Sequence, residues 1–252
     1  MRPSGSNCEH CGKPIMRIVV EGAFTMPTFC DCQGAVAERE ANEKEWKDKE
    51  AADKLRMARE RAQRLLKESN LGERFQARTF DTFKVTPQNK EAYQDAKSFV
   101  ADFRKPETKG RGMILAGSVG TGKTHLTAAI VNDLVQIGID CIFGNITTLL
   151  GRLKNSYNGD GDNEAEIMGK YCNCALLVID DLGKEKTTEW VQEKLYAIIN
   201  HRYEHYRKTI ITTNDNFKTL EAKLGEAVVS RLIEMCDGYK LDGSDYRKRK
   251  LQ

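Results

Sequence analysis

The chain has 252 residues, and its 40 Lys and Arg side chains exceed its 37 Asp and Glu side chains by a formal net charge of +3. Hydrophobic residues make up 40% of the sequence, which is enough for a globular core, and its apolar runs are far shorter than the ~20 residues of a membrane span. Residues 1–6 lack the apolar core of a secretory signal. We therefore expect a cytoplasmic protein that has no membrane partner.

Four of the eight cysteines lie near the start of the chain, in a C-x-x-C pair and a C-x-C pair. Disulfide frameworks are typical of short secreted chains, so we expect these thiols to be reduced and available for metal. Tetrahedral Zn²⁺ takes four soft ligands, and a small segment gains much of its folding energy from the metal. Residues 1–34 are therefore predicted to form a zinc-binding segment, with Cys8, Cys11, Cys30 and Cys32 as ligands.

Two alternatives to this ligand set stay open. His10 can replace one of the sulfurs, and the four cysteines can be unpaired surface thiols without a metal. The other cysteines lie in apolar surroundings and are expected in the core: Cys141, Cys172, Cys174 and Cys236.

Residues 35–70 are predicted to be a charged helical linker or docking helix. Between positions 35 and 68, 19 of 34 residues are charged, and neither Pro nor Gly occurs. Such a helix is polar nearly all round and has only a thin apolar stripe. It suits a role in bridging or docking, and a solvated spacer is the alternative.

Residues 71–252 have an ordinary globular composition in which strand-like and helix-like segments alternate. This alternation predicts an α/β fold with a parallel sheet that helices cover on both faces. Strands are expected at 113–116, 141–143, 175–179 and 209–213, and helices at 124–136, 145–157 and 190–203.

A glycine-rich turn follows the first of these strands and precedes a helix. It fits G-x-x-x-x-G-K-[ST], a pattern in which glycines let backbone N–H groups surround phosphate oxygens at a helix N-terminus. Lys123 adds a full charge at the β- and γ-phosphates, and the Thr124 hydroxyl can ligate Mg²⁺. A glycine turn that binds nothing is the alternative. The predicted ATP-binding residues are Gly117, Ser118, Val119, Gly120, Thr121, Gly122, Lys123 and Thr124.

Two later strands are predicted to end in polar side chains. The first ends in Asp180, expected to join Thr124 at the magnesium ion, and in Asp181, expected to polarise the attacking water. For Asp181 a helix cap or a solvated turn is the alternative. The second ends in Asn214, which can orient the water. A Thr-Thr-Asn stretch alone is more often a turn. The glycine-rich turn and the strand that ends in two Asp residues occur in the same chain, and they favour the catalytic interpretation.

The order of these motifs resembles that of helicase loaders of the DnaC/DnaI type, which are AAA+ ATPases, and the related IstB transposition helpers share most of it. The resemblance covers about residues 70–252 and implies an AAA+ P-loop ATPase core at 71–252 that hydrolyses ATP with Mg²⁺. The Cys-rich start and the charged helix also resemble the N-terminal region of such loaders. Five segments carry the resemblance: 117–124 (GSVGTGKT), 176–183 (LLVIDDLG), 210–214 (IITTN), 224–232 (LGEAVVSRL) and 243–247 (GSDYR).

The resemblance also implies roles for two arginines. Arg231, in Ser-Arg-Leu, matches the arginine finger that acts on ATP held by a neighbouring subunit, which implies a homo-oligomer in the ATP-bound state. Arg247, in Ser-Asp-Tyr-Arg, matches the sensor-2 arginine that contacts the γ-phosphate of its own subunit. In isolation either arginine would be read as part of a surface salt bridge. Ala227 stands where relatives often have Arg, so one basic contact can be missing.

In the family the region before the ATPase domain contacts a hexameric replicative helicase, and single-stranded DNA is a further expected partner. The preferred DNA surface is the helix from 145 to 157, with Arg152, Lys154 and Tyr157 near its end, and the basic residues 246–250 are a second candidate. No residue of the helicase interface can be named.

The sequence therefore favours an ATP-dependent loader of a replicative helicase. An IstB-like helper ATPase that binds DNA and a transposase is the main alternative. A small-molecule P-loop kinase fits less well, because no acceptor-binding lid follows the P-loop. A zinc-bearing adaptor that binds nucleotide without hydrolysis is the remaining class.

Overall fold

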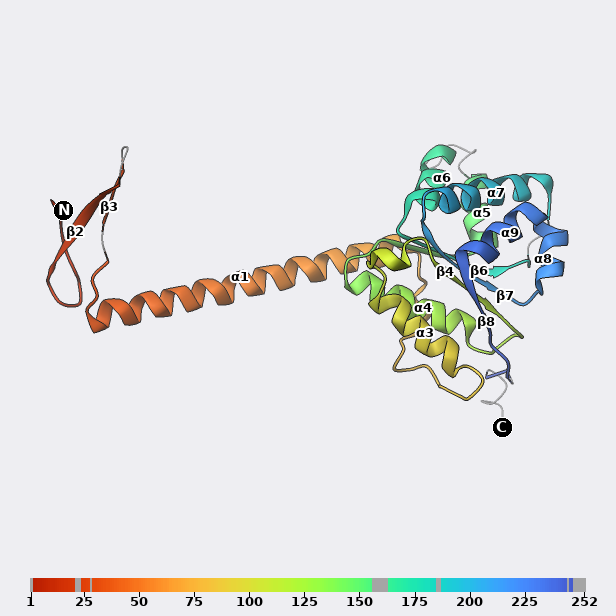
Figure 1. Ribbon diagram of the computed structural model, residues 1–252, viewed down its shortest axis with the longest axis horizontal. Coiled ribbons are helices and arrows are strands. Elements are labelled where there is room, and N and C mark those ends of the chain that lie inside the picture. The colour runs from red at the N-terminus through yellow and green to blue at the C-terminus, as the bar shows by residue number, and fades with distance from the viewer. Residues whose placement is uncertain are drawn as a thin grey trace. The chain divides into compact units, whose positions relative to one another are not determined.

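The computed structural model describes residues 2–20, 24–27, 29–155, 163–184, 187–243 and 245–246. The chain divides into two compact units, Met1–Ala58 and Arg59–Gln252 (Figure 1). A search of the described helices finds none with the length and apolar character that crossing a bilayer requires.

The first unit begins with a small antiparallel sheet that the sequence analysis did not anticipate. Strands β1 (Arg2–Asn7), β2 (Pro14–Val20) and β3 (Phe24–Pro27) lie in the order β1-β2-β3. The two cysteine pairs flank this sheet: the first follows β1 and the second precedes helix α1 (Gln33–Glu68).

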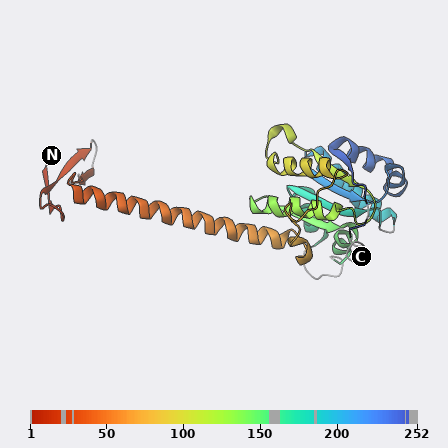
Figure 2. The same cartoon turned by 90° about the horizontal axis from the view of Figure 1, so that it is seen from below.

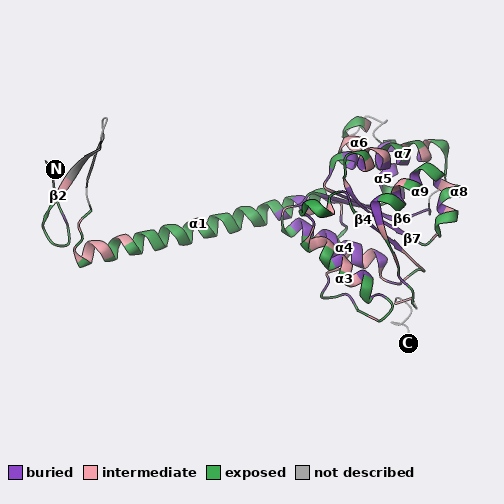
Figure 3. Cartoon of the chain, in the orientation of Figure 1, coloured by how far each residue is buried: buried purple, intermediate pink, exposed green. Residues whose placement is uncertain are grey.

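Helix α1 confirms the long helix predicted from charge composition. Side chains four residues apart form ion pairs along it, such as Glu43–Lys47 and Glu50–Lys54, each at 2.6 Å. Most of its length is exposed (Figure 3), and even Trp46 keeps 63% of its surface accessible. Only Ala62 and Leu65, within the second unit, are buried. Local charge pairs, more than packing, therefore support most of this helix.

The second unit is built on one five-stranded parallel sheet (Figure 2). The strand order is β5-β6-β7-β4-β8, which confirms the predicted parallel sheet and adds an edge strand, β8, that was not predicted. The strands are β4 (Gly112–Ala116), β5 (Cys141–Asn145), β6 (Leu176–Leu182), β7 (Lys208–Thr213) and β8 (Cys236–Lys240).

Helices cover both faces of this sheet (Figure 1). One face carries α2 (Glu73–Gln76), α3 (Lys90–Ala101) and α4 (Lys123–Gln136). The other carries α5 (Ile146–Asn155), α6 (Glu164–Asn173), α7 (Glu189–Glu204), α8 (Phe217–Leu224) and α9 (Glu226–Met235). A 3₁₀ turn, η1 (Pro106–Thr108), precedes β4.

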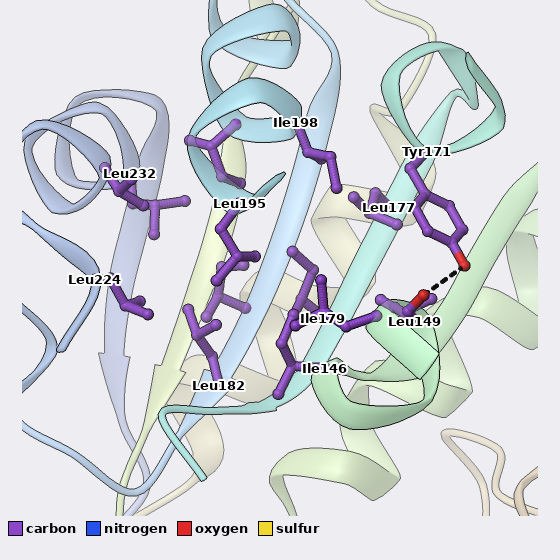
Figure 4. Close-up of a cluster of buried hydrophobic side chains, with 14 of the residues drawn as sticks. Ile146, Leu149, Tyr171, Leu177, Ile179, Leu182, Leu195, Ile198, Leu224 and Leu232 are labelled. Atoms are coloured by element: carbon purple, nitrogen blue, oxygen red, sulfur yellow. Dashed lines mark hydrogen bonds between the residues drawn. The ribbon is translucent and has the colours of Figure 1, made fainter. Parts of the chain in front are cut away.

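Alternate side chains of each strand point into two separate cores. In β4, Met113 and Leu115 join the core under α4, whereas Ile114 joins the core under α7 and α9. Figure 4 shows the second core, in which the Tyr171 hydroxyl donates to the Leu149 carbonyl at 3.2 Å. The expectation that four cysteines lie in the core is confirmed, because Cys141, Cys172, Cys174 and Cys236 are all buried.

A fully buried arginine on α7 is hydrogen-bonded to the chain at the N-terminal ends of β6 and β7. Arg202 is 0% exposed, and its guanidinium donates to the carbonyls of Tyr171, Cys174 and Lys208 and to the Thr209 hydroxyl. Carbonyl oxygens thus replace the water that the cation loses on burial. Nothing in the sequence pattern singled out this residue.

Candidate functional site

The strand order places the carboxyl ends of β6, β7 and β4 side by side, and the predicted phosphate loop leaves β4 at this edge. Two of its glycines are required by geometry. Gly122, just before α4, has φ = +99°, which L side chains rarely adopt. At Gly117 an added Cβ would lie 2.1 Å from the Leu241 carbonyl oxygen. The loop therefore bends tightly and presents backbone rather than side chains.

Lys123 begins α4 and is only 5% exposed. Its ammonium donates to the carbonyls of Gly117 and Ser118 and to Oδ1 of Asn214, each at 2.8 Å. Lys123 and Asn214, which were predicted to act on the phosphates and on the water respectively, are thus in direct contact between the start of α4 and the end of β7. The Lys123 ammonium has three N–H donors, and one of them can turn from these acceptors to a phosphate oxygen while the backbone of Lys123 stays in place.

The predicted magnesium residues also meet. The Thr124 hydroxyl donates to both carboxylate oxygens of Asp180 at 3.0 Å, and Asp180 is 5% exposed. Burial raises the pKa of Asp180, while the hydrogen bond from Thr212 opposes that rise. A hydroxyl beside a carboxylate is the oxygen donor set that Mg²⁺ prefers. The residues present therefore fit the ion.

Thr212 is a site residue that the sequence analysis missed. Its hydroxyl donates to Asp180 Oδ1 at 2.6 Å and accepts from the backbone N–H of Asp181 at 2.8 Å. It thereby fixes two carboxylate residues of the neighbouring strand. Thr212 lies in the same stretch as Asn214, but its contact with Asp180 depends on the pairing of β6 with β7.

Asp181 lies where the pairing of β6 with β7 shifts register. Its φ of +58° is unusual for a residue other than glycine, and its carboxylate pairs with Lys184 at 2.6 Å. Because the backbone turns at Asp181, the two adjacent carboxylates have different partners: that of Asp180 contacts Thr124 and that of Asp181 contacts Lys184. The role of Asp181 in polarising the attacking water stays a prediction.

The last described residues run along the phosphate loop. The backbone N–H of Leu241 donates to Ala116 O at 2.8 Å, and that of Tyr246 donates to Gly120 O at 3.1 Å. Leu241 is thereby fixed to the end of β4 and Tyr246 to the phosphate loop. The sensor-2 candidate, Arg247, follows Tyr246 directly but lies outside the described residues.

Arg231 makes its contacts elsewhere, on α7 and α9. Its guanidinium lies over the rings of Tyr196 and Tyr203, at 5.2 and 5.7 Å from their centroids, and Nη1 donates to Ala227 O at 2.9 Å. Arg231 Nε is buried and has no hydrogen-bond partner among the described residues. The structure therefore does not group this arginine with Lys123, Thr124, Asp180 and Asn214.

The preferred DNA surface is only partly described. Arg152 and Lys154 stand at the end of α5, and the Lys154 ammonium lies 5.0 Å from the ring centroid of Trp190. Tyr157 and residues 247–250 fall outside the described residues. The aromatic that Lys154 meets here is thus Trp190, which the sequence analysis did not connect with it.

The four N-terminal cysteines converge in the first unit. Their sulfurs all lie within 4.8 Å of one another, with Cys8–Cys32 at 3.7 Å and Cys11–Cys30 at 3.4 Å. Sulfurs in a tetrahedral zinc site stand ~3.8 Å apart, given Zn–S bonds of ~2.3 Å. The cluster is therefore compatible with Zn²⁺.

Neighbouring groups act on these thiols in opposite directions, since the pKa of Cys30 is raised, partly by the hydrogen bond with Cys11 and by burial, while that of Cys8 is lowered. Backbone N–H groups of Cys11 and His10 lower the pKa of Cys8 to about 6. The His10 ring does not replace a sulfur; its Nε2 lies 2.7 Å from Glu38 Oε2, and this contact joins the cluster to α1. The four sulfurs make a complete ligand set without it.

The site combines backbone amides at a helix N-terminus, a buried lysine, a hydroxyl–carboxylate pair and a polar residue at the end of a strand. These features define the nucleotide site of a P-loop ATPase of the AAA+ class. Comparison with known proteins agrees. The IstB-like ATP binding protein family matches residues 28–252, and the chain belongs to this family.

Several relatives share its ATPase unit. The replicative helicase loader DnaC of Escherichia coli (strain K12) is 27% identical over 171 residues, which are 68% of this chain and 69% of that protein. YqaM of Bacillus subtilis (strain 168) is 28% identical over 205 residues, and the chain covers 64% of it, slightly less than two thirds.

Solved structures give the same result. The crystal structure of the DnaC helicase loader matches with a TM-score of 0.61 and 30% identity, covering 68% of this chain and 100% of that one. The structure of DnaI, with a TM-score of 0.60 and 22% identity over 70% of this chain and 94% of that one, supports the fold. The chain is thus of the DnaC loader type within the AAA+ ATPases.

Replacing Lys123 tests the nucleotide site. Lys123→Ala removes a charge-assisted hydrogen bond worth ~1.5–3 kcal/mol, so ATP affinity should fall by about 10- to 100-fold and turnover should be lost. Titration with a fluorescent ATP analogue measures the affinity. Lys67→Ala, on an exposed helical position, is the matched control and should bind ATP normally. An unchanged affinity in Lys123→Ala would contradict the site.

Proposed function

We propose that this protein is a Mg²⁺-dependent ATPase that loads a hexameric replicative helicase onto DNA in the cytoplasm. The observation that carries this proposal is the likeness to the DnaC helicase loader, whose solved chain is covered in full. The nucleotide site and the cysteine cluster before a charged helix support it.

Within the site, each side chain has one task in the proposed reaction. The amides of residues 117–124 and the Lys123 ammonium hold the phosphates and neutralise charge on them. Thr124 and Asp180 hold the magnesium ion, which supplies Lewis-acid stabilisation of the phosphate oxygens. Asp181 and Asn214 orient the attacking water, and Thr212 keeps Asp180 in place.

Arg231 supplies the remaining positive charge to a neighbouring copy. Its stacking on Tyr196 and Tyr203 holds the guanidinium on the surface of α7 and α9, ready to meet another subunit rather than its own phosphate loop. Hydrolysis then depends on an ATP-bound homo-oligomer, with Arg247 as the proposed contact to the γ-phosphate within each copy.

Removing this guanidinium separates binding from turnover. Arg231→Ala should lower turnover by about 10³-fold or more and leave ATP affinity unchanged, because an arginine finger acts on charge that develops in the transition state. Steady-state ATPase assays and nucleotide titration measure the two quantities. Arg64→Ala, an exposed arginine of α1, is the matched control and should behave as the unaltered chain.

A mixing experiment makes the test sharper. Arg231→Ala retains an intact ATP site and Lys123→Ala retains the guanidinium, so mixing the two inactive variants should restore part of the turnover at shared interfaces. If the mixture stays inactive while the variants associate, Arg231 does not act between copies.

The helicase is proposed to dock on the N-terminal unit. Trp46 is the strongest candidate contact on α1, since 63% of its surface is exposed. Tagged full-length protein should capture a hexameric helicase from cell extract, and Trp46→Ala should weaken the capture. Leu55→Ala is the control, because Leu55 is also exposed but lies about 180° around the axis of α1 from Trp46. Capture of a transposase would instead favour the IstB-like helper.

Zinc is proposed to fold the N-terminal segment. Purified protein should carry about one zinc per chain, and Cys11→Ser should lose it, because a three-thiolate site holds the ion less tightly. Elemental analysis measures the stoichiometry. Cys172→Ser, in the buried core, is the control and should keep the metal. Metal-free protein with four intact thiols would contradict the proposal.

A further inference from the structure

The ends of β6 and β7 carry the two residues that are proposed to orient the attacking water. Asp181 is the residue before the last in β6, and Asn214 directly follows β7. The pairing of these strands shifts register between Ile179 and Leu182, so the regular backbone ladder is interrupted beside Asp181. Contacts made by side chains are therefore needed to fix the spacing of the two strand ends.

Hydroxyls of β7 make the contacts within the sheet. Besides the bond from Thr212 to Asp180, the Thr213 hydroxyl donates to the Leu182 carbonyl at 2.8 Å. It also accepts from the backbone N–H of Asp215 at 3.0 Å. These bonds fasten the last residues of the two strands to each other, and the chain that follows the strands is fastened by a different element.

Lys223, on α8, bridges the chain beyond both strands. Its ammonium donates to the Gly183 carbonyl at 2.5 Å and to Oδ2 of Asp215 at 2.6 Å. Gly183 directly follows β6, and Asp215 directly follows Asn214. One ammonium can hold both acceptors because it has three N–H donors.

The backbone of Lys223 is itself held on the side away from the strands. Its carbonyl accepts from Nε2 of Gln192, on α7, at 2.9 Å. The adjacent Leu224 and Leu220, one turn earlier on α8, are buried in the core that Figure 4 shows. The ammonium is therefore carried by an anchored helix, and the two strand ends are positioned against it.

The contact is closely fitted. Gly183 has φ = +97°, and an added Cβ would lie 2.3 Å from Asp215 Oδ2, so only glycine allows the two segments to approach this far. The side chains of Lys223 and Asp215 are only 34% and 25% exposed. The ion pair is thus better shielded from water than a pair on the open surface, and its geometry is more strongly defined.

We propose that Lys223 is a positioning residue of the ATPase reaction, which sets the spacing between Asp181 and Asn214 and so their aim at the attacking water. The role rests on the proposed ATPase function, and Lys223 acts through Gly183 and Asp215. It also lies in the last turn of α8, where a cation stabilises the helix dipole. That effect alone needs no contact with either strand end, and it would change stability rather than turnover.

Measuring turnover and affinity separately tests this role. Lys223→Met keeps the aliphatic length of the side chain and removes the ammonium. In the full-length protein kcat for ATP should fall by about 100-fold, because a misplacement of about 1 Å at the reacting atoms costs that much. ATP affinity in a nucleotide titration should stay unchanged, since Lys123 and the phosphate loop are intact. Lys218→Met, at an exposed position of the same helix, is the matched control and should keep normal turnover.

A double-variant cycle tests whether Lys223 acts through Asp215. Asp215→Asn should also lower kcat at unchanged ATP affinity. The double variant should lose no more turnover than Lys223→Met alone, because both changes remove the same contact. Losses that multiply would show that the two residues act independently, and would overturn the role.

Mixing variants separates this role from an effect on Arg231, which lies on the helix that follows α8. Lys223→Met supplies the guanidinium and Arg231→Ala supplies an intact ATP site, so a mixture of the two should regain part of the turnover. A mixture of Lys223→Met with Lys123→Ala should regain none. Recovery in the second mixture would show that Lys223 serves the arginine instead of its own site, and would overturn the role.

Two further results would overturn it. One is a normal kcat in Lys223→Met. The other is a loss of kcat and ATP affinity by the same factor, which would indicate a purely structural lysine. In both cases Lys123→Ala would still abolish turnover, and the proposed ATPase function would stand. An unaltered chain without turnover would instead overturn both proposals.

Discussion

The buried ammonium of Lys123 is the interaction on which the site depends. A cation with 5% exposure needs acceptors, and it finds them on the phosphate loop and at Asn214 on β7. The contact is possible only because β7 lies between β6 and β4, which brings the ends of three strands to one edge. Sheet order, more than any single residue, thus assembles groups that are about ninety residues apart in the chain.

Much of the ATPase unit could be predicted because its signals are local. The glycine pattern, the apolar strand before Asp180 and the charge run of α1 each report on a few adjacent residues. Strand β8 was missed because CDGYK has no apolar alternation; it forms by pairing with β4 at the sheet edge. Thr212 was missed because its role is set by the carboxylate of another strand, which no spacing reveals.

Two buried cations at the strand entrances illustrate what only the fold can show. Arg202 is surrounded by carbonyls, and its guanidinium is therefore well satisfied. Lys208, close by in sequence, has one carbonyl and two phenyl rings, and burial lowers the pKa of both cations. Burial alone therefore does not say how well a cation is accommodated; the number of acceptors around it does.

The place of Arg231 on α7 and α9, away from its own Lys123, has a consequence for symmetry. If the guanidinium serves another copy, each subunit has one donating face and one receiving face. Such copies join head to tail, and a two-fold pair, which buries identical patches against each other, cannot satisfy both faces. Each added copy must then be related to the previous one by the same rotation. One ATP site in the assembly lacks a neighbour's arginine unless the last copy contacts the first and closes a ring.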